Sequence, residues 1–365
     1  MKSRSLTVVM AAALIALSCP KALALVQFND GGVHDIDYMI DTDVLVDYQA
    51  PGMQTTVNIL PGGGVSDPYS LSAYNDSRVN IPGGTIGRDL YAYDSSAVTV
   101  SNGTIGSSLR AYDGSSVTVN DGCIGKLATS GSSSATVTEG SIGTLEPSGS
   151  SSVTVSGGWV SIIWSSGSSS VTISSAMGYE VWAFDDSSVN LYDVTISDFF
   201  NAEDNCSVNL YGVTITSGPL CANRNSSVIF SGGMIGEGLS VHDDSSVTVY
   251  GGEIGGDLIV EDEHNPEIAG GIIIHGYDFA VDGVPFGYGE LTSFFGGSNE
   301  NEPARRLTGI LADGSILNND FYIGYHGKIT LVPEPATVFL LGLGGLAVIR
   351  RRRTALRGDT GVAGC

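Results

Sequence analysis

The chain has 365 residues, of which 42% are hydrophobic and only 15% charged, and it contains 50 glycines. Its formal net charge is −23, and the basic ends conceal 8 basic against 38 acidic residues within 25–349, a net charge of −30. Such an acidic body repels nucleic acid and anionic lipid, so we expect no nucleic-acid partner.

The N-terminus has the pattern of a secretory signal peptide. A basic start precedes a short apolar run, and Ala22 and Ala24 supply the small-x-small cleavage motif. We predict a signal peptide over 1–24 that signal peptidase removes after Ala24. About ten apolar residues are too few for a membrane span, which argues against an anchor. The pair Ser18-Cys19 leaves a lipoprotein leader as an alternative.

Residues 25–56 precede the repeat described next, and we expect them to form an irregular N-terminal cap. A weak copy of the repeat begins near Val57. A cap is expected because the open end of a stack of strands exposes unpaired backbone edges.

A repeat of 18 to 20 residues occurs about eleven times between residues 79 and 275. Each copy starts with an apolar pair one residue apart, and we call the first residue of that pair the origin. The origins are Val79, Val98, Val117, Ala135, Val153, Val171, Val189, Val208, Val228 and Val247, with a degenerate copy at Pro266.

Two further apolar anchors follow each origin. The second anchor lies seven residues on, as at Ile105, and is Ile273 in the degenerate copy. The third anchor is Leu109 in the same copy, and the next origin always follows it by eight residues. Every insertion therefore falls between the second and third anchors, and we predict that this corner of the coil varies in length.

Three short apolar segments in 18 to 20 residues predict three short strands per coil. We predict an all-β fold, a parallel β-helix (β-solenoid) of about 11–12 coils over 57–275. At the inter-strand spacing of about 4.8 Å, it would be a rod roughly 50–60 Å long. The uneven spacing of the anchors argues against a left-handed helix of hexapeptides, so a right-handed helix is favoured.

Small polar runs precede most origins, and Ser recurs two residues before them. We expect external ladders in which Ser, Asn and Asp side chains hydrogen-bond along the rod and satisfy the turns. Calcium binding by the acidic turns is a weaker alternative. The residues with Ser at this position are Ser77, Ser96, Ser115, Ser133, Ser151, Ser169, Ser187, Ser226 and Ser245.

The sequence contains no cofactor or metal motif that we recognise, so neither is expected. The five histidines show no zinc-type spacing. Cys206 and Cys221 could form a disulfide after export, and unpaired thiols are the equal alternative.

Outward aromatic residues are the one candidate binding feature of the rod. Trp164 and Trp182 share one register, and Tyr192 and Tyr211 share another. Exposed rings in register suit carbohydrate stacking, and they also serve as ordinary stabilising ladders. An extracellular polysaccharide is therefore a candidate partner.

Enzymatic activity is the competing interpretation, because parallel β-helices include polysaccharide-cleaving enzymes. A glycoside hydrolase needs two carboxylates at a suitable separation. The acidic residues here, such as Asp185 with Asp186, continue the repeat, whereas a catalytic site should interrupt it. We therefore expect no enzymatic activity and keep a polysaccharide-active hydrolase as the alternative.

Beyond the repeat, 276–331 is expected to be a C-terminal cap and spacer, with a hairpin that turns at Asp313-Gly314. The tail then shows three features in order. Pro333-Glu334-Pro335 comes first, followed by a short apolar run over 336–349 and a basic cluster. That cluster consists of Arg350, Arg351, Arg352 and Arg353.

This order resembles the PEP-CTERM sorting signal, and we assign it to 332–353. The resemblance implies recognition by an exosortase, a transpeptidase-like membrane enzyme, and export to the bacterial surface or extracellular matrix. The short apolar run would hold the protein transiently in the inner membrane, with 354–365 as a cytoplasmic tail. An ordinary single-pass anchor is the alternative. Together, the features predict an exported structural or adhesive β-solenoid.

Overall fold

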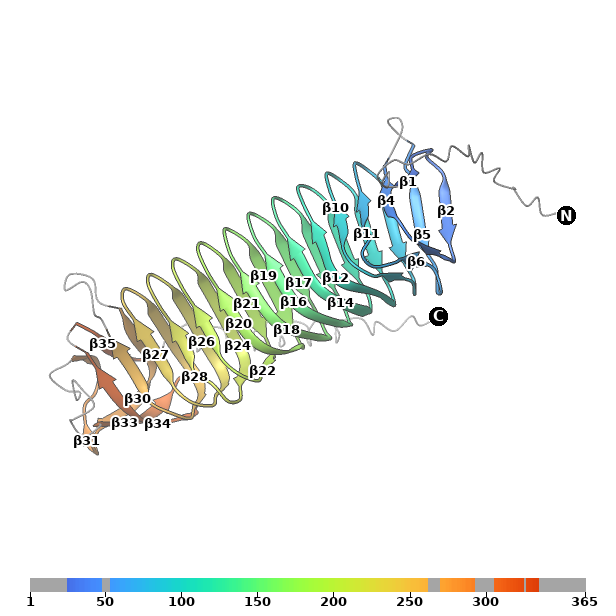
Figure 1. The fold of residues 1–365 in the computed structure, drawn as a ribbon. Coiled ribbons are helices and arrows are strands. Elements are labelled where there is room, and N and C mark those ends of the chain that lie inside the picture. The colour runs from blue at the N-terminus through green and yellow to red at the C-terminus, as the bar shows by residue number, and fades with distance from the viewer. Residues whose placement is uncertain (1–24, 48–52, 262–269, 293–304, 325, 335–365) are drawn as a thin grey trace, which may run out of the picture.

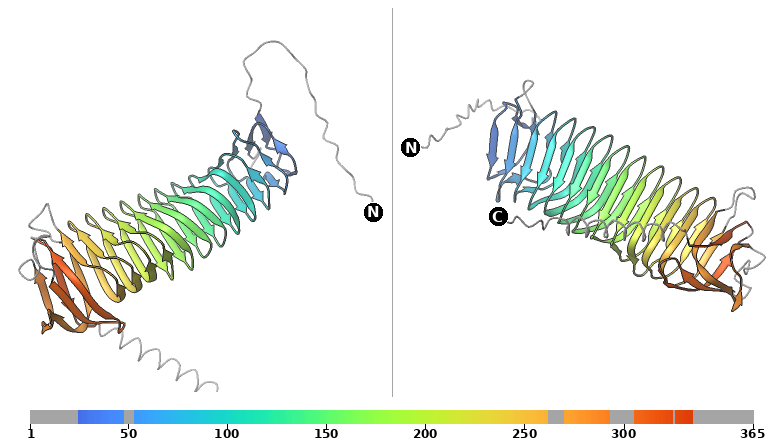
Figure 2. Two further views of the ribbon diagram at one scale, coloured as in Figure 1. Left: turned by 60° about the horizontal axis from the view of Figure 1, so that its bottom comes forward. Right: turned by 180° about the vertical axis from the view of Figure 1, so that it is seen from behind.

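The computed structural model describes residues 25–47, 53–261, 270–292, 305–324 and 326–334. They form one long rod of stacked coils that follow each other in chain order (Figures 1 and 2). The rod is a β-solenoid of about 12 turns with mostly parallel strands, which confirms the predicted fold class. Its handedness stays a prediction. The predicted signal peptide, with Ala22 and Ala24, lies outside the described residues.

The N-terminal part of the rod consists of separate short strands, three to a coil. Residues 25–46, expected to be irregular, already pair in parallel with the following coil, so the regular stack begins earlier than the repeat is visible. The strands are β1 (Leu25–Phe28), β2 (Val33–Ile36), β3 (Met39–Ile40), β4 (Asp43–Val46), β5 (Thr56–Ile59), β6 (Gly64–Val65), β7 (Leu71–Ala73), β8 (Arg78–Ile81), β9 (Thr85–Ile86) and β10 (Leu90–Ala92).

In the middle of the rod, the second and third strands of each coil join into one bent strand. The register between β12 and β14 shifts between Ile105 and Ser108, in the corner that was predicted to vary in length. The strands are β11 (Ala97–Val100), β12 (Gly103–Ala111), β13 (Ser116–Val119), β14 (Gly122–Thr129), β15 (Ser134–Val137), β16 (Ser141–Pro147), β17 (Ser152–Val155), β18 (Trp159–Ser165), β19 (Ser170–Ser174) and β20 (Met177–Ala183).

Further along, the first and second strands of a coil tend to join instead. The strands are β21 (Ser188–Tyr192), β22 (Thr195–Ile196), β23 (Phe200–Ala202), β24 (Ser207–Ile215), β25 (Leu220–Ala222), β26 (Ser227–Ile235), β27 (Leu239–His242), β28 (Ser246–Ile254), β29 (Leu258–Glu261) and β30 (Gly271–Val281).

The core is built from columns of anchors that stack coil upon coil. Val79, Val98 and Val117 are in register, and so are Leu90, Leu109 and Leu127. All of these side chains are buried. Because side chains alternate along a strand, the residues between the anchors point outward. The residues that repeat in the sequence are therefore those buried inside the rod.

The last coil departs from the alignment made on the sequence. Ile272 pairs with Val247 and is buried, whereas Ile273 pairs with the outward Thr248. Ile272 is thus the true origin, and Ile273 is not the second anchor. Pro266 lies outside the described residues. The error arose because the connection from the preceding third anchor, Leu258, is longer here than in the other coils.

The turn before each origin requires a left-handed backbone. The residue four places before the origin has a positive φ in ten successive coils, with values near 50–66°. Asn, Asp and Gly tolerate this conformation best, which explains the composition of the turn. These residues are Asn75, Asp94, Asp113, Gly131, Gly149, Gly167, Asp185, Asp204, Arg224 and Asp243.

The recurring serines of this turn are buried, which corrects the expected external ladder. Five of the nine hydroxyls bond backward along the rod, inside the corner, to a carbonyl of the preceding coil. The other four are enclosed and have no hydrogen-bond partner among the described residues: Ser96, Ser115, Ser187 and Ser226. The Ser133 hydroxyl donates to the carbonyl of Ala111 at 3.1 Å, and that of Ser245 to the carbonyl of Ala222 at 2.7 Å. Cys206 occupies the same position in its coil.

The C-terminal end of the rod is closed by antiparallel strands. The hairpin of β33 and β34 turns at Asp313-Gly314, as predicted, and lies against β30. Phe321 and Ile329 continue two core columns above Leu258 and Ile272. The strands are β31 (Val284–Pro285), β32 (Gly289–Thr292), β33 (Arg305–Leu311), β34 (Ile316–Ile323) and β35 (Lys328–Val332).

No helix long and apolar enough to cross a membrane occurs within the described ranges. The apolar run 336–349 and the tail 354–365 lie outside those ranges.

Candidate functional site: an aromatic groove

The outward residues of the third strands form one long face of the rod, which we call the third-strand face. Two outward positions recur on it, one and three residues after each third anchor. Near the N-terminal end, Tyr74, Tyr93 and Tyr112 occupy the later position in three successive coils. Their rings stack at centroid distances of 4.8 and 5.1 Å, and Tyr91 extends the stack at 6.1 Å from Tyr93.

A second aromatic cluster lies further along the same face. Trp182 stacks on Phe184 at 5.8 Å, and the ring of Trp164 meets both at steep angles, at 6.2 and 6.1 Å. Phe199 closes the cluster with an edge contact to Trp182 at 5.1 Å. Trp164 remains 48% exposed. Its ring therefore offers a surface to a ligand.

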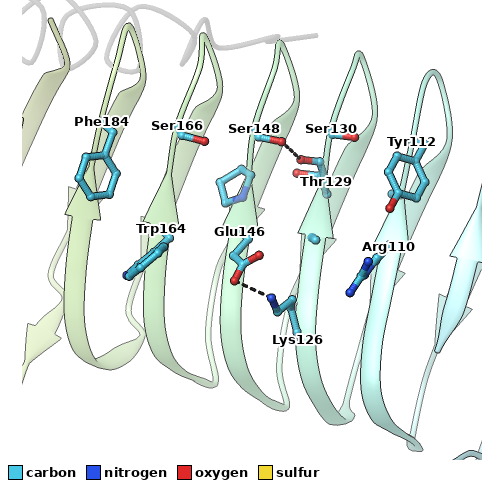
Figure 3. A pocket seen from close by; sticks show the side chains of 13 residues that line it. Arg110, Tyr112, Lys126, Thr129, Ser130, Glu146, Ser148, Trp164, Ser166 and Phe184 are labelled. Atoms are coloured by element: carbon cyan, nitrogen blue, oxygen red, sulfur yellow. Dashed lines mark hydrogen bonds and ion pairs between the residues drawn. The ribbon is translucent and has the colours of Figure 1, made fainter. Parts of the chain in front are cut away.

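A groove of about 450 Å³ lies between the tyrosine stack and this cluster (Figure 3). Figure 3 shows Tyr112 at one end, Phe184 at the other, and a row of serines between them. The serines, Ser130, Ser148 and Ser166, take the position that carries aromatic rings in the flanking coils. The hollow exists because three successive coils have a small residue at this position.

Charged side chains line the lower side of the groove. Lys126 and Glu146 form an ion pair at 2.8 Å, and each side chain is 34% exposed. The Arg110 guanidinium lies over the ring of Tyr91, 5.9 Å from its centroid. The Nε–H of Arg110 is enclosed and has no hydrogen-bond partner among the described residues. A hydrogen bond with Tyr112 raises the pKa of Arg110, so its positive charge is secure.

Asp89 interacts electrostatically with Arg110 and forms an ion pair with Arg88 at 3.5 Å. Burial by itself would raise the pKa of Asp89, but hydrogen bonds from Ser107, Tyr91 and Ser108, together with the charge of Arg110, lower it overall. The Tyr91 hydroxyl donates to Asp89 at 3.2 Å. The charged residues that line the groove are thus Arg110, Lys126 and Glu146, with Asp89 near Arg110 but outside the lining, in contrast to the strongly acidic body of the protein.

A second hollow of about 530 Å³ lies on the other side of the tyrosine stack. Its lining includes Tyr69, Tyr74, Arg88 and Tyr91. Tyr74 and Tyr91 thus belong both to the stack and to this hollow. The third-strand face therefore presents two hollows divided by one wall of stacked rings.

The structure separates the four aromatic residues predicted to contact carbohydrate. Trp164 and Trp182 are neighbours in register and both belong to the cluster beside the groove. Tyr192 and Tyr211 are also neighbours and stack at 5.1 Å, but they lie at the ends of first strands, away from the groove. They form a separate surface ladder.

Several residues of the groove and of the second hollow were not singled out from the sequence. Arg110, Glu146, Phe184 and Tyr74 stand one or three residues after a third anchor, and reading these two outward positions down the coils would have identified them. Lys126 stands one residue before the third anchor Leu127, so that register does not include it. The depth of the groove could not be predicted from the sequence, because it depends on how neighbouring side chains pack.

The lining of the groove has few groups suited to acid–base catalysis. Glu146 is the one carboxylate among the described residues that line it, and Lys126 neutralises that group. Hydrolysis of a glycosidic bond requires two carboxyl groups with different roles. Nor does any group of three His, Cys, Asp or Glu side chains that could hold a metal ion occur in the described part of the chain.

The cysteines of the rod are free thiols. Cys206 is buried, and burial raises the pKa of its thiol to about 12. Burial also raises the pKa of Cys221. Cys123 is exposed.

The start of the predicted sorting signal lies directly on the end of the rod. His275 stacks on Tyr250 at a centroid distance of 4.3 Å, and its Nδ1 lies 3.4 Å from the carbonyl oxygen of Pro333. Pro333 follows β35 without a linker. Pro335 and the cluster Arg350, Arg351, Arg352 and Arg353 lie outside the described residues.

Residues 331–353 match the family model of the PEP-CTERM protein-sorting motif. The chain therefore carries this motif, which is the recognition signal for exosortase processing and marks an exported protein. Neither a curated protein nor a solved structure matches the chain.

Proposed function

We propose that this protein is a non-enzymatic structural or adhesive rod of the bacterial surface or extracellular matrix. The single observation that carries the proposal is the sorting motif at 331–353, which begins where the last strand of the rod ends. Exosortase processing of that motif would release or transfer the whole solenoid as one unit.

The regularity of the rod supports a structural role. The columns of buried apolar anchors and the left-handed turn before the origin recur from coil to coil along the rod. The groove departs from the repeat only in its outward side chains. Its one carboxylate, neutralised by Lys126, supports binding in preference to hydrolysis.

The route of export can be tested in an exosortase-containing bacterial host and in the same host lacking that enzyme. With the enzyme, we expect the chain outside the inner membrane, with both the leader and the C-terminal tail missing by mass. Without it, the chain should stay in the inner-membrane fraction. Intact chain in the cytoplasm of both hosts would contradict the proposal.

A matched pair of variants isolates the motif. Replacing Pro333, Glu334 and Pro335 together by alanine should reproduce the retention seen without exosortase. Pro285→Ala, which alters an exposed proline on the short strand β31, should be exported and processed normally.

A further inference from the structure

We propose that the groove between Tyr112 and Phe184 is a binding site for a neutral polysaccharide. This inference rests on the proposed function, because it requires that the rod meet glycans outside the cell. It assigns a ligand class to one defined place on the rod.

The aromatic ends of the groove supply apolar surfaces for sugar rings. Trp164 is 48% exposed, and its partners Trp182 and Phe184 fix its orientation from behind. An aromatic ring held rigidly in this way loses little conformational entropy when a ligand packs against it. The C–H face of a pyranose ring is a suitable partner for such a surface.

The floor of the groove supplies hydrogen-bonding groups. Ser130, Ser148 and Ser166 contribute hydroxyls, and the Lys126–Glu146 pair contributes both donors and acceptors within one ion pair. The Arg110 guanidinium also lines the groove, and it contributes further N–H donors along this edge.

The length of the groove indicates a polymer. Tyr112 and Phe184 are four coils apart, which corresponds to about 19 Å at the spacing of parallel strands. The groove runs along the rod (Figure 3). Beyond Tyr112, the face continues over the tyrosine stack to the second hollow. A chain of sugar residues could follow this track, whereas a single sugar would fill a small part of it.

The charges of the groove point to a neutral chain. Lys126 is paired with Glu146, so the lining keeps a single net positive charge, that of Arg110, and the nearby Asp89, which also pairs with Arg88, offsets part of it. Residues 25–349 carry a net charge of −30, which would repel a polyanion. A peptide strand is disfavoured because the floor is the face of a sheet whose backbone groups already pair between coils.

Affinity electrophoresis of the full chain, in a mild detergent, tests the inference. Native gels would contain hydroxyethylcellulose, dextran, galactomannan, xylan or polygalacturonate. We expect retardation by at least one neutral polysaccharide and none by polygalacturonate. The inference would be overturned if no neutral polysaccharide retarded the chain, or if polygalacturonate alone did so. Binding of the chain only to an unstructured control peptide would also overturn it.

Variants locate the site. The double variant Trp164→Ala/Phe184→Ala should weaken binding by about tenfold or more, because it removes both rings at one end of the groove. The variant Trp164→Phe, which keeps a ring, should retain most of the binding. Tyr192→Ala/Tyr211→Ala removes a stacked pair elsewhere, each residue of which is 39% exposed, and should bind as the unaltered protein does.

The result is independent of the test of export. Thermal unfolding of each variant shows whether a loss of binding reflects a loss of fold. If the chain is exported and processed but the two double variants bind equally, the groove is not the site and the proposed function still stands.

Discussion

The first-strand face and the third-strand face belong to the same coils but carry different outward residues. On the first strands, Thr99, Thr118, Thr136, Thr154 and Thr172 follow one another in register as a column of hydroxyls. On the third strands, the column three residues after the anchor changes from rings to serines and back to a ring within seven coils. The interior beneath both faces is the same stack of aliphatic anchors.

This difference teaches where specificity can arise in a solenoid. Inward positions are constrained by the coil above and the coil below, so they repeat. Outward positions have neighbours on fewer sides, so a change in one coil is tolerated. An abrupt change in an outward column is then more informative about binding than any feature of the repeat itself.

The largest expected effect comes from a substitution in the buried core beneath both faces. Leu127 is fully buried beneath the groove, and Leu127→Ala would leave a cavity that the stacked neighbours cannot fill. We expect a loss of about 2–5 kcal/mol in the free energy of unfolding, measured by urea denaturation. Thr136→Ala, on the first-strand face, should change it by no more than about 0.5 kcal/mol. Equal losses in the free energy of unfolding would show that Leu127 is not in the core and Thr136 not on the surface.

The sequence predicts the inside of this rod far better than its outside. The columns headed by Val79 and Leu90 were identified from spacing alone, because each coil must bury the same three apolar points. The buried Ser133 was expected on the surface, since a small polar residue in a turn gives no sign of which way it points. For the groove, the sequence gives only the register of the outward residues. Its depth could not be predicted, because it comes from the packing of Trp164 against Phe184.

The next effect concerns the corner where coils differ in length. A Cβ on Gly143 would lie 2.4 Å from the carbonyl oxygen of Gly125, so one of the two stacked backbones must move. Gly143→Ala should cost about 1–3 kcal/mol of stability, as overpacking does in other cores. Gly114→Ala, where the nearest atom would be 3.2 Å away, is the matched control and should cost less. The opposite order in urea denaturation would contradict a tightly stacked corner.

An acid titration sharpens the comparison on the third-strand face. The pKa of Asp89 is lowered in the folded protein, so its carboxylate stabilises the fold at pH values above its ordinary pKa. That contribution is lost as the pH falls through the lowered value. Asp89→Asn weakens hydrogen bonds to a charged acceptor and should therefore cost about 1–2 kcal/mol at pH 7.

The stability difference between this variant and the unaltered protein should shrink steadily toward acid pH. Asp186→Asn, in an exposed turn, serves as the control and should show a much smaller difference at every pH. A difference for Asp89→Asn that stays constant with pH would mean that its carboxylate is not stabilised by its hydrogen-bond donors and by Arg110.

The smallest effect separates binding from stability within the groove. Lys126 and Glu146 are close but each is 34% exposed, so water and salt screen their attraction. A double-mutant cycle with Lys126→Met and Glu146→Gln should give a coupling of about 0.2–1 kcal/mol in urea denaturation, and less at high salt. In both single variants, the loss in the free energy of binding neutral polysaccharide should exceed the loss in the free energy of unfolding, because each variant leaves an unbalanced charge facing the ligand. If the free energy of unfolding fell severalfold more than the free energy of binding, the ion pair would be a structural element of the rod. The affinity of the groove would then come from the aromatic rings alone.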